Sequence, residues 1–207
     1  MKIMVFVGSD SPDSIQMLLA RYVASLFDKS KIEILDLTKV ETDSLSWAMD
    51  NSPDTASQIQ KLASKIDETS LCIISLPEKN DSYQEAFKKM FDALARIPNR
   101  KVLGKKPVVL VSASLGVLDG INGVEAIGLA RQELERNQSE ILASFSCPNF
   151  HENFKEGQMV NTAIYLELMR KVNHIKQTHF KAYYNYQSFT CGIDPERDGG
   201  CGDANEY

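Results

Sequence analysis

The sequence predicts a three-layer α/β/α sandwich in which helices cover both faces of a five-stranded parallel sheet. Five short apolar runs alternate with amphipathic helical segments along the 207 residues, and no run is long enough to span a membrane. The connections between these segments are mostly short. Short connections with right-handed crossovers favour a doubly wound sheet, for which five strands commonly take the order 2-1-3-4-5.

Each expected strand is a short apolar run, which is typical of parallel strands that are buried on both faces. The first run leads directly into Gly8 and Ser9 and is too short for the core of a signal peptide, so we interpret it as a strand. The expected strands cover Lys2–Val7, Lys31–Leu37, Leu71–Leu76, Pro107–Ala113 and Glu140–Ser146.

The expected helices follow from apolar residues at helical spacing. The first is predicted to have Ser11 as its N-cap and Pro12 as its first helical residue, and its apolar stripe covers 15–26. The third is predicted to begin at Ser82, which opens a capping-box pattern. The remaining helices are expected over 56–66, 123–136 and 161–184.

Composition indicates one compact domain that binds a small molecule. The chain is 43% hydrophobic with a formal net charge of −5, which argues against nucleic acid or an anionic membrane as a partner. We expect a single domain over 1–186 and an acidic, Gly-rich tail over 187–207. The cysteines have no metal-ligand or CxxC spacing, which favours a reduced, cytoplasmic setting and predicts no metal site.

Other chemistries have less support in the sequence. No Gly-x-Ser-x-Gly elbow occurs, and the three histidines share no triad spacing with an acid and a serine, so a hydrolase is not expected. Basic residues of the last helix, among them Arg170 and Lys171, alternate with tyrosines. At this net charge we interpret them as a solvated flank and not as an RNA-binding face.

Polar loops follow the first, third and fourth expected strands. Carboxyl ends of parallel strands meet at one edge of a sheet, so these loops are expected to line one crevice. The first loop, 8–14, offers hydroxyls and backbone amides for a phosphate, although Asp10 and Asp13 oppose an anion there. An ordinary strand-to-helix turn explains the same residues equally well.

The other two loops also allow a structural and a functional interpretation. Pro77 leads into a polar stretch, 78–82, that either lies against a flat ring or merely turns the chain and caps the next helix. The third loop, 112–116 with Gly120, either approaches a ligand closely through its glycines or is a flexible turn.

Together the three loops resemble those of the NADPH-dependent FMN reductase family, which has a flavodoxin-like fold. The resemblance covers 2–148, including the entry to the fourth strand at 105–108. It rests on Gly8-Ser9 with Ser14, on Pro77-Glu78 with Asn80 and Ser82, and on Ser112, Ser114, Gly116 and Gly120. The FMN-binding positions that it implies are Ser9, Ser11, Ser14, Gln16, Pro77, Glu78, Lys79, Asn80, Ser82, Ser112, Ser114, Gly116 and Gly120.

The chain departs from the family pattern in two loops. The first loop of the family usually reads Gly-Ser-x-Arg-x-x-Ser-x-Asn, but here Ser11 takes the Arg position and Gln16 the Asn position. The second usually reads Pro-Glu-Tyr-Asn-Gly-Ser, but here Lys79 replaces the Tyr and Asp81 the Gly. Loss of a charge-assisted phosphate contact costs about 1.5–3 kcal/mol, enough to weaken flavin binding tenfold or more.

The resemblance implies a flavin-dependent NAD(P)H oxidoreductase. FMN would take hydride at N5 from NADPH or NADH and pass electrons to a flavin, quinone, azo compound or metal oxyanion. The cofactor carries this chemistry, so no catalytic side chain is assigned. The resemblance also implies a homodimer or homotetramer with flavin near the subunit boundary.

Two other hypotheses stay open at this point. The departures in the flavin loops suggest a flavodoxin-like binding or interaction protein with weakened or lost FMN binding. A pure electron carrier is less favoured, because its acidic docking surface would need more acid than the chain carries outside the tail.

Overall fold

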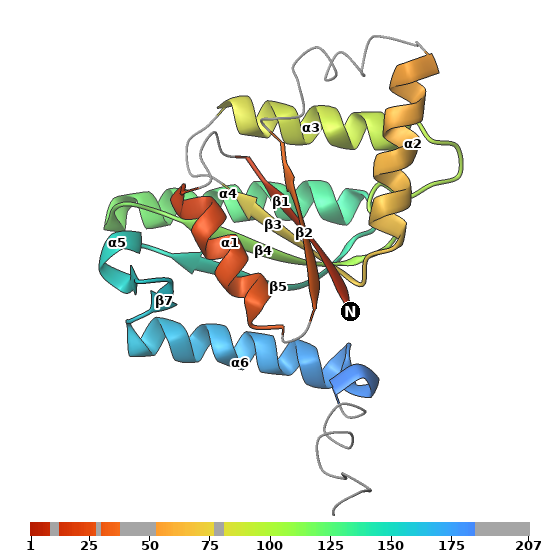
Figure 1. The fold of residues 1–207 in the computed structure, drawn as a ribbon. Helices are drawn as coiled ribbons and strands as arrows, with labels where there is room; N and C mark the ends of the chain where they lie inside the picture. The colour runs from red at the N-terminus through yellow and green to blue at the C-terminus, as the bar shows by residue number, and fades with distance from the viewer. Residues whose placement is uncertain (9–12, 28–29, 38–52, 77–80, 185–207) are drawn as a thin grey trace, which may run out of the picture.

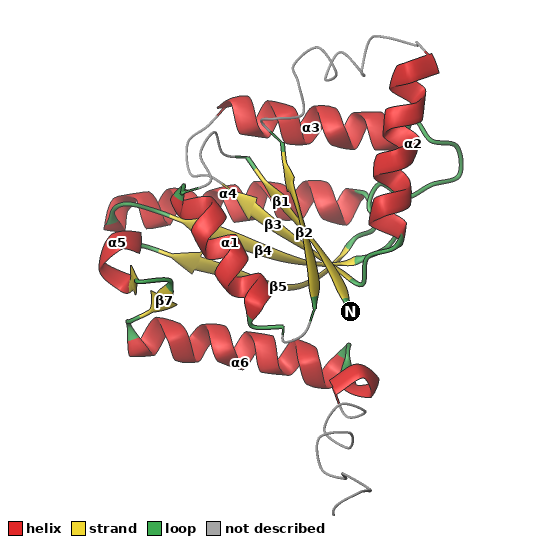
Figure 2. Ribbon diagram, in the orientation of Figure 1, coloured by secondary structure: helices red, strands yellow, loops and turns green. Residues whose placement is uncertain are grey.

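The computed structural model describes residues 1–8, 13–27, 30–37, 53–76 and 81–184, and it confirms the predicted architecture (Figure 1). A five-stranded parallel sheet has the order β2-β1-β3-β4-β5. Helices cover both of its faces (Figure 2). The strands are β1 (Lys2–Val7), β2 (Lys31–Asp36), β3 (Leu71–Leu76), β4 (Pro107–Ala113) and β5 (Glu140–Cys147). The expected tail over 187–207 lies outside the described residues.

The strands lie where the apolar runs predicted them, to within one residue at each end. The three central strands β1, β3 and β4 are largely buried, whereas the edge strands β2 and β5 are partly exposed. All six residues of β3 are buried, as expected for a central parallel strand. β5 is an edge strand and contains a register shift: Val108 pairs with Ile141, whereas Val109 pairs with Ala143. Leu142 is therefore an extra residue, and β5 is bulged at this point.

Two hydrophobic clusters form the core, one on each face of the sheet. Alternate residues of β3 separate between them, since Leu71 and Ile73 face α1 (Ile15–Ser25) and α6 (Thr162–Thr178), whereas Cys72 and Ile74 face the opposite helices. The opposite face is covered by α2 (Pro53–Asp67), α3 (Asp81–Ala95) and α4 (Val117–Arg136). Among the described helices, none combines the length and apolar composition needed to cross a bilayer.

The structure corrects the predicted start of the first helix. α1 begins at Ile15, and its N-cap is Ser14, whose hydroxyl oxygen accepts a hydrogen bond from the backbone N–H of Met17 at 3.2 Å. The prediction that Ser11 caps this helix is wrong, and Ser11 and Pro12 themselves lie outside the described residues. Ser14 satisfies a first-turn donor directly, so the helix needs no earlier cap.

Three further helix starts differ from the prediction, and α2 begins at Pro53, three residues before the expected start. α3 begins at Asp81, so Ser82 lies in its first turn and is not its N-cap. α4 begins at Val117, six residues before the expected start, so Gly120 lies inside a helix and not in a loop. The glycines lower the helical propensity of this stretch, but the packing of α4 against β4 and β5 overrides that preference. α6 ends at Thr178, and residues 181–184 form a separate helical turn.

A short segment after β5 was not predicted. It consists of α5 (Phe150–Asn153) and a hairpin of β6 (Phe154–Lys155) and β7 (Gln158–Met159). The turn between the two strands has positive φ at Glu156 (50°) and Gly157 (77°), as tight hairpin turns require. The segment is anchored by Phe150, which is 1% exposed and stacks on Phe154 with ring centroids 4.8 Å apart.

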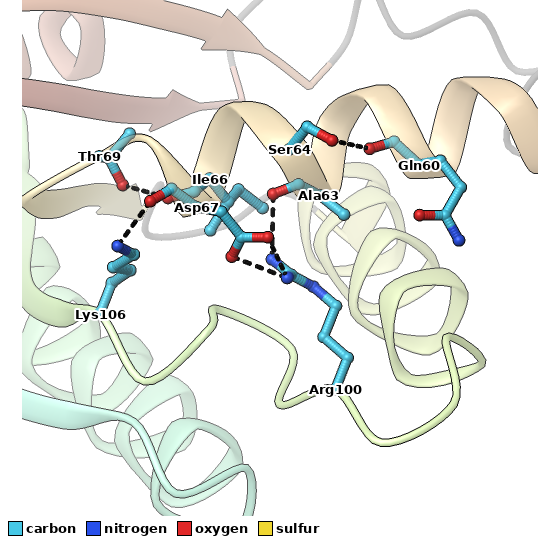
Figure 3. A network of polar contacts seen from close by, with 8 residues as sticks. All are labelled: Gln60, Ala63, Ser64, Ile66, Asp67, Thr69, Arg100 and Lys106. Carbon is cyan, nitrogen blue, oxygen red and sulfur yellow. Dashed lines mark hydrogen bonds and ion pairs between the residues drawn. The ribbon is translucent and has the colours of Figure 1, made fainter.

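A polar network links the C-terminus of α2 to the loop that leads into β4 (Figure 3). The Arg100 guanidinium donates to both carboxylate oxygens of Asp67, at 2.7 and 2.5 Å, and to the carbonyl of Ala63 at 3.1 Å. Lys106 donates to the carbonyl of Asp67 at 2.7 Å. Cationic side chains thus satisfy carbonyls in the last turn of α2 and complement its negative end. The loop can pass this close only because Gly104, with φ 59°, carries no side chain.

Two glycine-to-alanine substitutions are expected to change stability in opposite directions. At Gly104 a Cβ would lie 2.8 Å from Asp67 Oδ1 at positive φ, so Gly104→Ala should lower the free energy of unfolding by about 1–2 kcal/mol. At Gly128, inside α4, a Cβ meets nothing within 4 Å, so Gly128→Ala should raise it by about 0.5–1 kcal/mol. Urea unfolding of the two variants measures both effects, and equal shifts would contradict the assignment.

Candidate functional site

Three strands end side by side at the edge of the sheet opposite the Asp67 network. The parallel register places Val7 of β1 beside Ser75 of β3, and Leu76 of β3 beside Ser112 of β4. The chain leaves β1 toward β2 on one side, whereas β3 and β4 lie on the other side. The order of the strands therefore reverses between β1 and β3, which is the position at which doubly wound sheets bind ligands.

The start of α1 supplies donors at this position. Gly8, directly after β1, is buried, and Ser14 is half-buried at the N-terminus of the helix. The oxygen of the Ser14 hydroxyl accepts from Met17 N–H, whereas its hydrogen has no acceptor among the described residues. Within the described residues the Ser14 hydroxyl thus keeps a hydrogen to donate, and it lies at the positive end of the helix dipole.

Gln16 links the first turn of α1 to the sheet. Its backbone carbonyl accepts a hydrogen bond at 3.2 Å from the hydroxyl of Ser75, which is fully buried on β3. The contact joins residues that are 59 positions apart in the sequence. It fixes the N-terminus of α1 relative to the end of β3, so the orientation of the Ser14 hydroxyl is set by the sheet.

The third predicted loop is held rigidly by Ser114, which is 1% exposed. Its N–H donates to the carbonyl of Cys147 at 3.0 Å, and its own carbonyl accepts from Phe150 N–H at 2.7 Å. Its hydroxyl donates to the carbonyl of Gly116 at 3.2 Å. All of its polar groups are thus used inside the protein, so Ser114 shapes the backbone of the loop. Gly116, the N-cap of α4, has no side chain to cover that backbone.

Two buried hydroxyls near this edge have no hydrogen-bond partner. They belong to Ser112 and Ser146, which pair in register across β4 and β5. Both lie on the face covered by α4, since Leu110 two residues before Ser112 packs in that cluster, whereas Phe145 and Cys147 beside Ser146 pack in the other. Unsatisfied buried groups cost stability and often mark a functional region.

The described part of this edge holds no activated nucleophile. Burial raises the pKa of the Cys147 thiol, at the end of β5, to about 11, so the sulfur stays protonated at neutral pH. Within the described ranges no group of three or more His, Cys, Asp or Glu side chains is arranged to hold a metal ion.

The structure places about half of the predicted site residues. Ser14, Gln16, Ser112, Ser114 and Gly116 are described and come to the same edge of the sheet. Ser82 and Gly120 lie in the first turns of α3 and α4, which also begin there. The remaining candidates, Ser9, Ser11, Pro77, Glu78, Lys79 and Asn80, lie outside the described residues.

Sequence reasoning missed two residues of the edge. Ser75 was assigned to a strand without a role, although a serine inside an otherwise apolar run is the signal that a buried hydroxyl has a partner. Phe150 was assigned to no element, although its ring stacks on Phe154 and its N–H donates to the Ser114 carbonyl of the third loop.

Comparison with known proteins gives a family. The model of the NADPH-dependent FMN reductase family matches residues 1–130. FerB, a flavoenzyme NAD(P)H:(acceptor) oxidoreductase from Paracoccus denitrificans, has a similar structure, with a TM-score of 0.65 and 19% identity over 87% of this chain and 97% of that one. The comparison with curated proteins gave no match.

Two other solved structures share the fold. The NADH:FMN oxidoreductase EMOB has a TM-score of 0.60 at 13% identity over 86% of this chain and 89% of its own. An NAD(P)H:quinone oxidoreductase from Methanothermobacter marburgensis has a TM-score of 0.55 at 11% identity over 86% and 96%. At these identities the likeness concerns the fold, whereas the family model covers well over half of the sequence. The chain therefore belongs to the NADPH-dependent FMN reductase family and is an NAD(P)H-dependent enzyme of that type.

Proposed function

We propose that this enzyme binds FMN at the edge where β1, β3 and β4 end, takes hydride from NADPH or NADH, and passes electrons to a small acceptor. The acceptor classes are free flavins, quinones, azo compounds and metal oxyanions. The observation that carries the proposal is the N-terminus of α1, where the Ser14 hydroxyl has a hydrogen to donate at the switch point of the sheet.

The described residues fit the phosphate of FMN. A phosphate needs backbone amides, hydroxyls and positive potential. The first turn of α1, an 11-residue helix, supplies the backbone amides and the positive potential. Ser14 adds a hydroxyl donor, and the bond between Ser75 and the Gln16 carbonyl holds the turn in position. Buried Gly8 leaves room beside the backbone. No full positive charge is contributed by this turn, which distinguishes it from the family pattern.

The third loop fits a flat ring because its backbone is fixed. The hydrogen bonds of Ser114 to Cys147, Phe150 and Gly116 hold its shape before any ligand arrives, so binding costs little ordering entropy. Bound FMN supplies the hydride acceptance and electron release of the reaction. The protein's part is to hold the cofactor and to leave its ring accessible to both substrates.

The proposal includes assembly into a homodimer or homotetramer in a reducing compartment such as the cytoplasm. Large apolar side chains are exposed near the start of α4 and along it, with Leu115 63%, Val124 61% and Leu129 57% exposed. Contact with a second copy would remove this surface from water. Cys72 and Cys147 are buried free thiols, as expected where disulfides do not form.

The alternative is a flavodoxin-like protein that has lost tight FMN binding. It is favoured by the departures from the family pattern in the first two loops, at Ser11, Gln16, Lys79 and Asp81. The two functions differ in a property that is simple to observe, namely flavin uptake by the purified protein.

The purified full-length chain is expected to quench the fluorescence of added FMN with saturation, and the loaded protein should oxidise NADPH or NADH when a quinone or azo dye is supplied. Absorbance at the flavin and nicotinamide bands measures both. If FMN remains fully fluorescent and no nicotinamide is oxidised, the binding-protein alternative is correct.

Ser14→Gly separates capping from phosphate binding. Glycine is a tolerable N-cap, so the free energy of unfolding should fall by only a few tenths of a kcal/mol. Loss of the hydroxyl donor should weaken FMN binding tenfold or more, because hydrogen bonds to charged groups contribute about 1.5–3 kcal/mol. Ser25→Gly is the matched control: it removes a hydroxyl at the other end of α1, where Ser25 donates to the Tyr22 carbonyl at 2.7 Å. Equal FMN affinity in the two variants would contradict the assignment.

Ser11→Arg tests the departure in the first loop. If FMN phosphate lies at this helix start, an arginine at position 11 should add a charge-assisted contact and tighten FMN binding about tenfold or more. Ser11→Gln, which is long but uncharged, should leave the affinity nearly unchanged. Fluorescence titration in low and high salt measures the effect, and unchanged binding by Ser11→Arg would place the phosphate elsewhere.

A further inference from the structure

A hollow lies between β5 and α6, and none of its lining residues belongs to β1, β3 or β4. It has a volume of about 260 Å³, and its lining consists of Leu142, Ala143, Arg170, Lys171 and His174. α6 packs beside this edge strand on the same face as α1 (Figure 1). The family assignment and the proposed function leave this hollow without a role.

The bulge in β5 forms the apolar side of the hollow. Leu142 is the extra residue between the pairs Val108–Ile141 and Val109–Ala143, and it lines the hollow together with Ala143. β5 is an edge strand, so its outer side has no further strand to cover it. A bulge at such an edge redirects side chains and ends regular pairing.

Lys171 is one of the two cationic side chains that line the hollow. Its ammonium donates to the Ser144 carbonyl at 2.8 Å, forms an ion pair with Glu167 and lies 6.0 Å from the centre of the Phe145 ring. The charge of Lys171 is thus balanced by Glu167 on the same helix. Lys171 thus holds α6 against β5, and the Glu167 carboxylate that pairs with it does not pair with Arg170.

Arg170 carries an unbalanced charge. Within the described ranges its guanidinium has no hydrogen bond or ion-pair partner, and the imidazole of His174, one helical turn further along, has none either. The two side chains are at i and i+4 and therefore project from the same face of α6. The hollow combines the positive charge of Arg170 and the imidazole of His174 with an apolar wall.

We propose that this hollow binds a small organic carboxylate with an apolar body. The planar fork of Arg170 matches the two oxygens of a carboxylate, His174 supplies a further ring N–H, and Leu142 with Ala143 contacts the apolar part. A single unbalanced charge favours a monoanion over a phosphate dianion. The site is independent of FMN binding.

Benzoate and its neutral isostere benzamide test the proposal on the full-length chain. Titration followed by amide chemical shifts should show saturable benzoate binding, with changes at 142–144 and 170–174 and none at 14–16. Benzamide should bind at least tenfold more weakly, because it lacks the charge that pairs with Arg170. Inorganic phosphate should bind more weakly than benzoate.

Arg170→Gln should weaken benzoate binding tenfold or more and leave benzamide binding unchanged. Arg21→Gln is the matched control, since it removes the same charge from an exposed position on α1 and should change neither. Retained amide dispersion shows that both variants fold. The proposal is wrong if Arg170→Gln binds benzoate like the wild type, if phosphate competes equally, or if the shifts fall at 14–16.

Discussion

Parallel pairing of β1 with β3 is the constraint on which the site depends. It brings the end of β1 beside a strand that is about 70 positions away in the sequence, and it forces the chain to leave β1 toward the opposite side. Because β3 is fully buried and β1 is buried from Ile3 to Val7, their register is fixed by the core and not by the loops. The Ser75 hydroxyl then ties α1 to this register through Gln16. The helix N-terminus is positioned by packing that is complete before any ligand binds.

The two ends of the sheet, the one where the strands begin and the one where they finish, are built differently. At the first end Arg100 and Lys106 satisfy the last turn of α2, and a glycine at positive φ lets the loop approach. At the other end the Ser112 and Ser146 hydroxyls are buried without partners, and the hydrogen of the Ser14 hydroxyl has no acceptor among the described residues. Buried polar atoms without a partner also lie at the first end, since the Arg100 Nε atom and the Ser139 hydroxyl just before β5 are unsatisfied there.

The strands could be predicted closely from the sequence because a buried parallel strand is a continuous apolar run with polar ends. Helix starts were harder. The Ser11-Pro12 pair has the form of a helix start, yet Ser14 caps α1, and the glycines near 120 indicate a loop, yet packing on β4 and β5 keeps them helical. The hairpin of β6 and β7 has two residues in each strand, too few for a periodic pattern. The predicted loops could be placed at one edge from topology, but the sequence could not show that the Ser114 hydroxyl is used internally or that Ser112 is buried.

A crystal structure of the full-length chain with FMN tests the central claim most directly. The account predicts the phosphate at the first turn of α1, within hydrogen-bond distance of the Ser14 hydroxyl, and the ring against the backbone of 114–116. A phosphate bound at any other helix start, or a ring that lies on the Arg100 edge of the sheet, would contradict it.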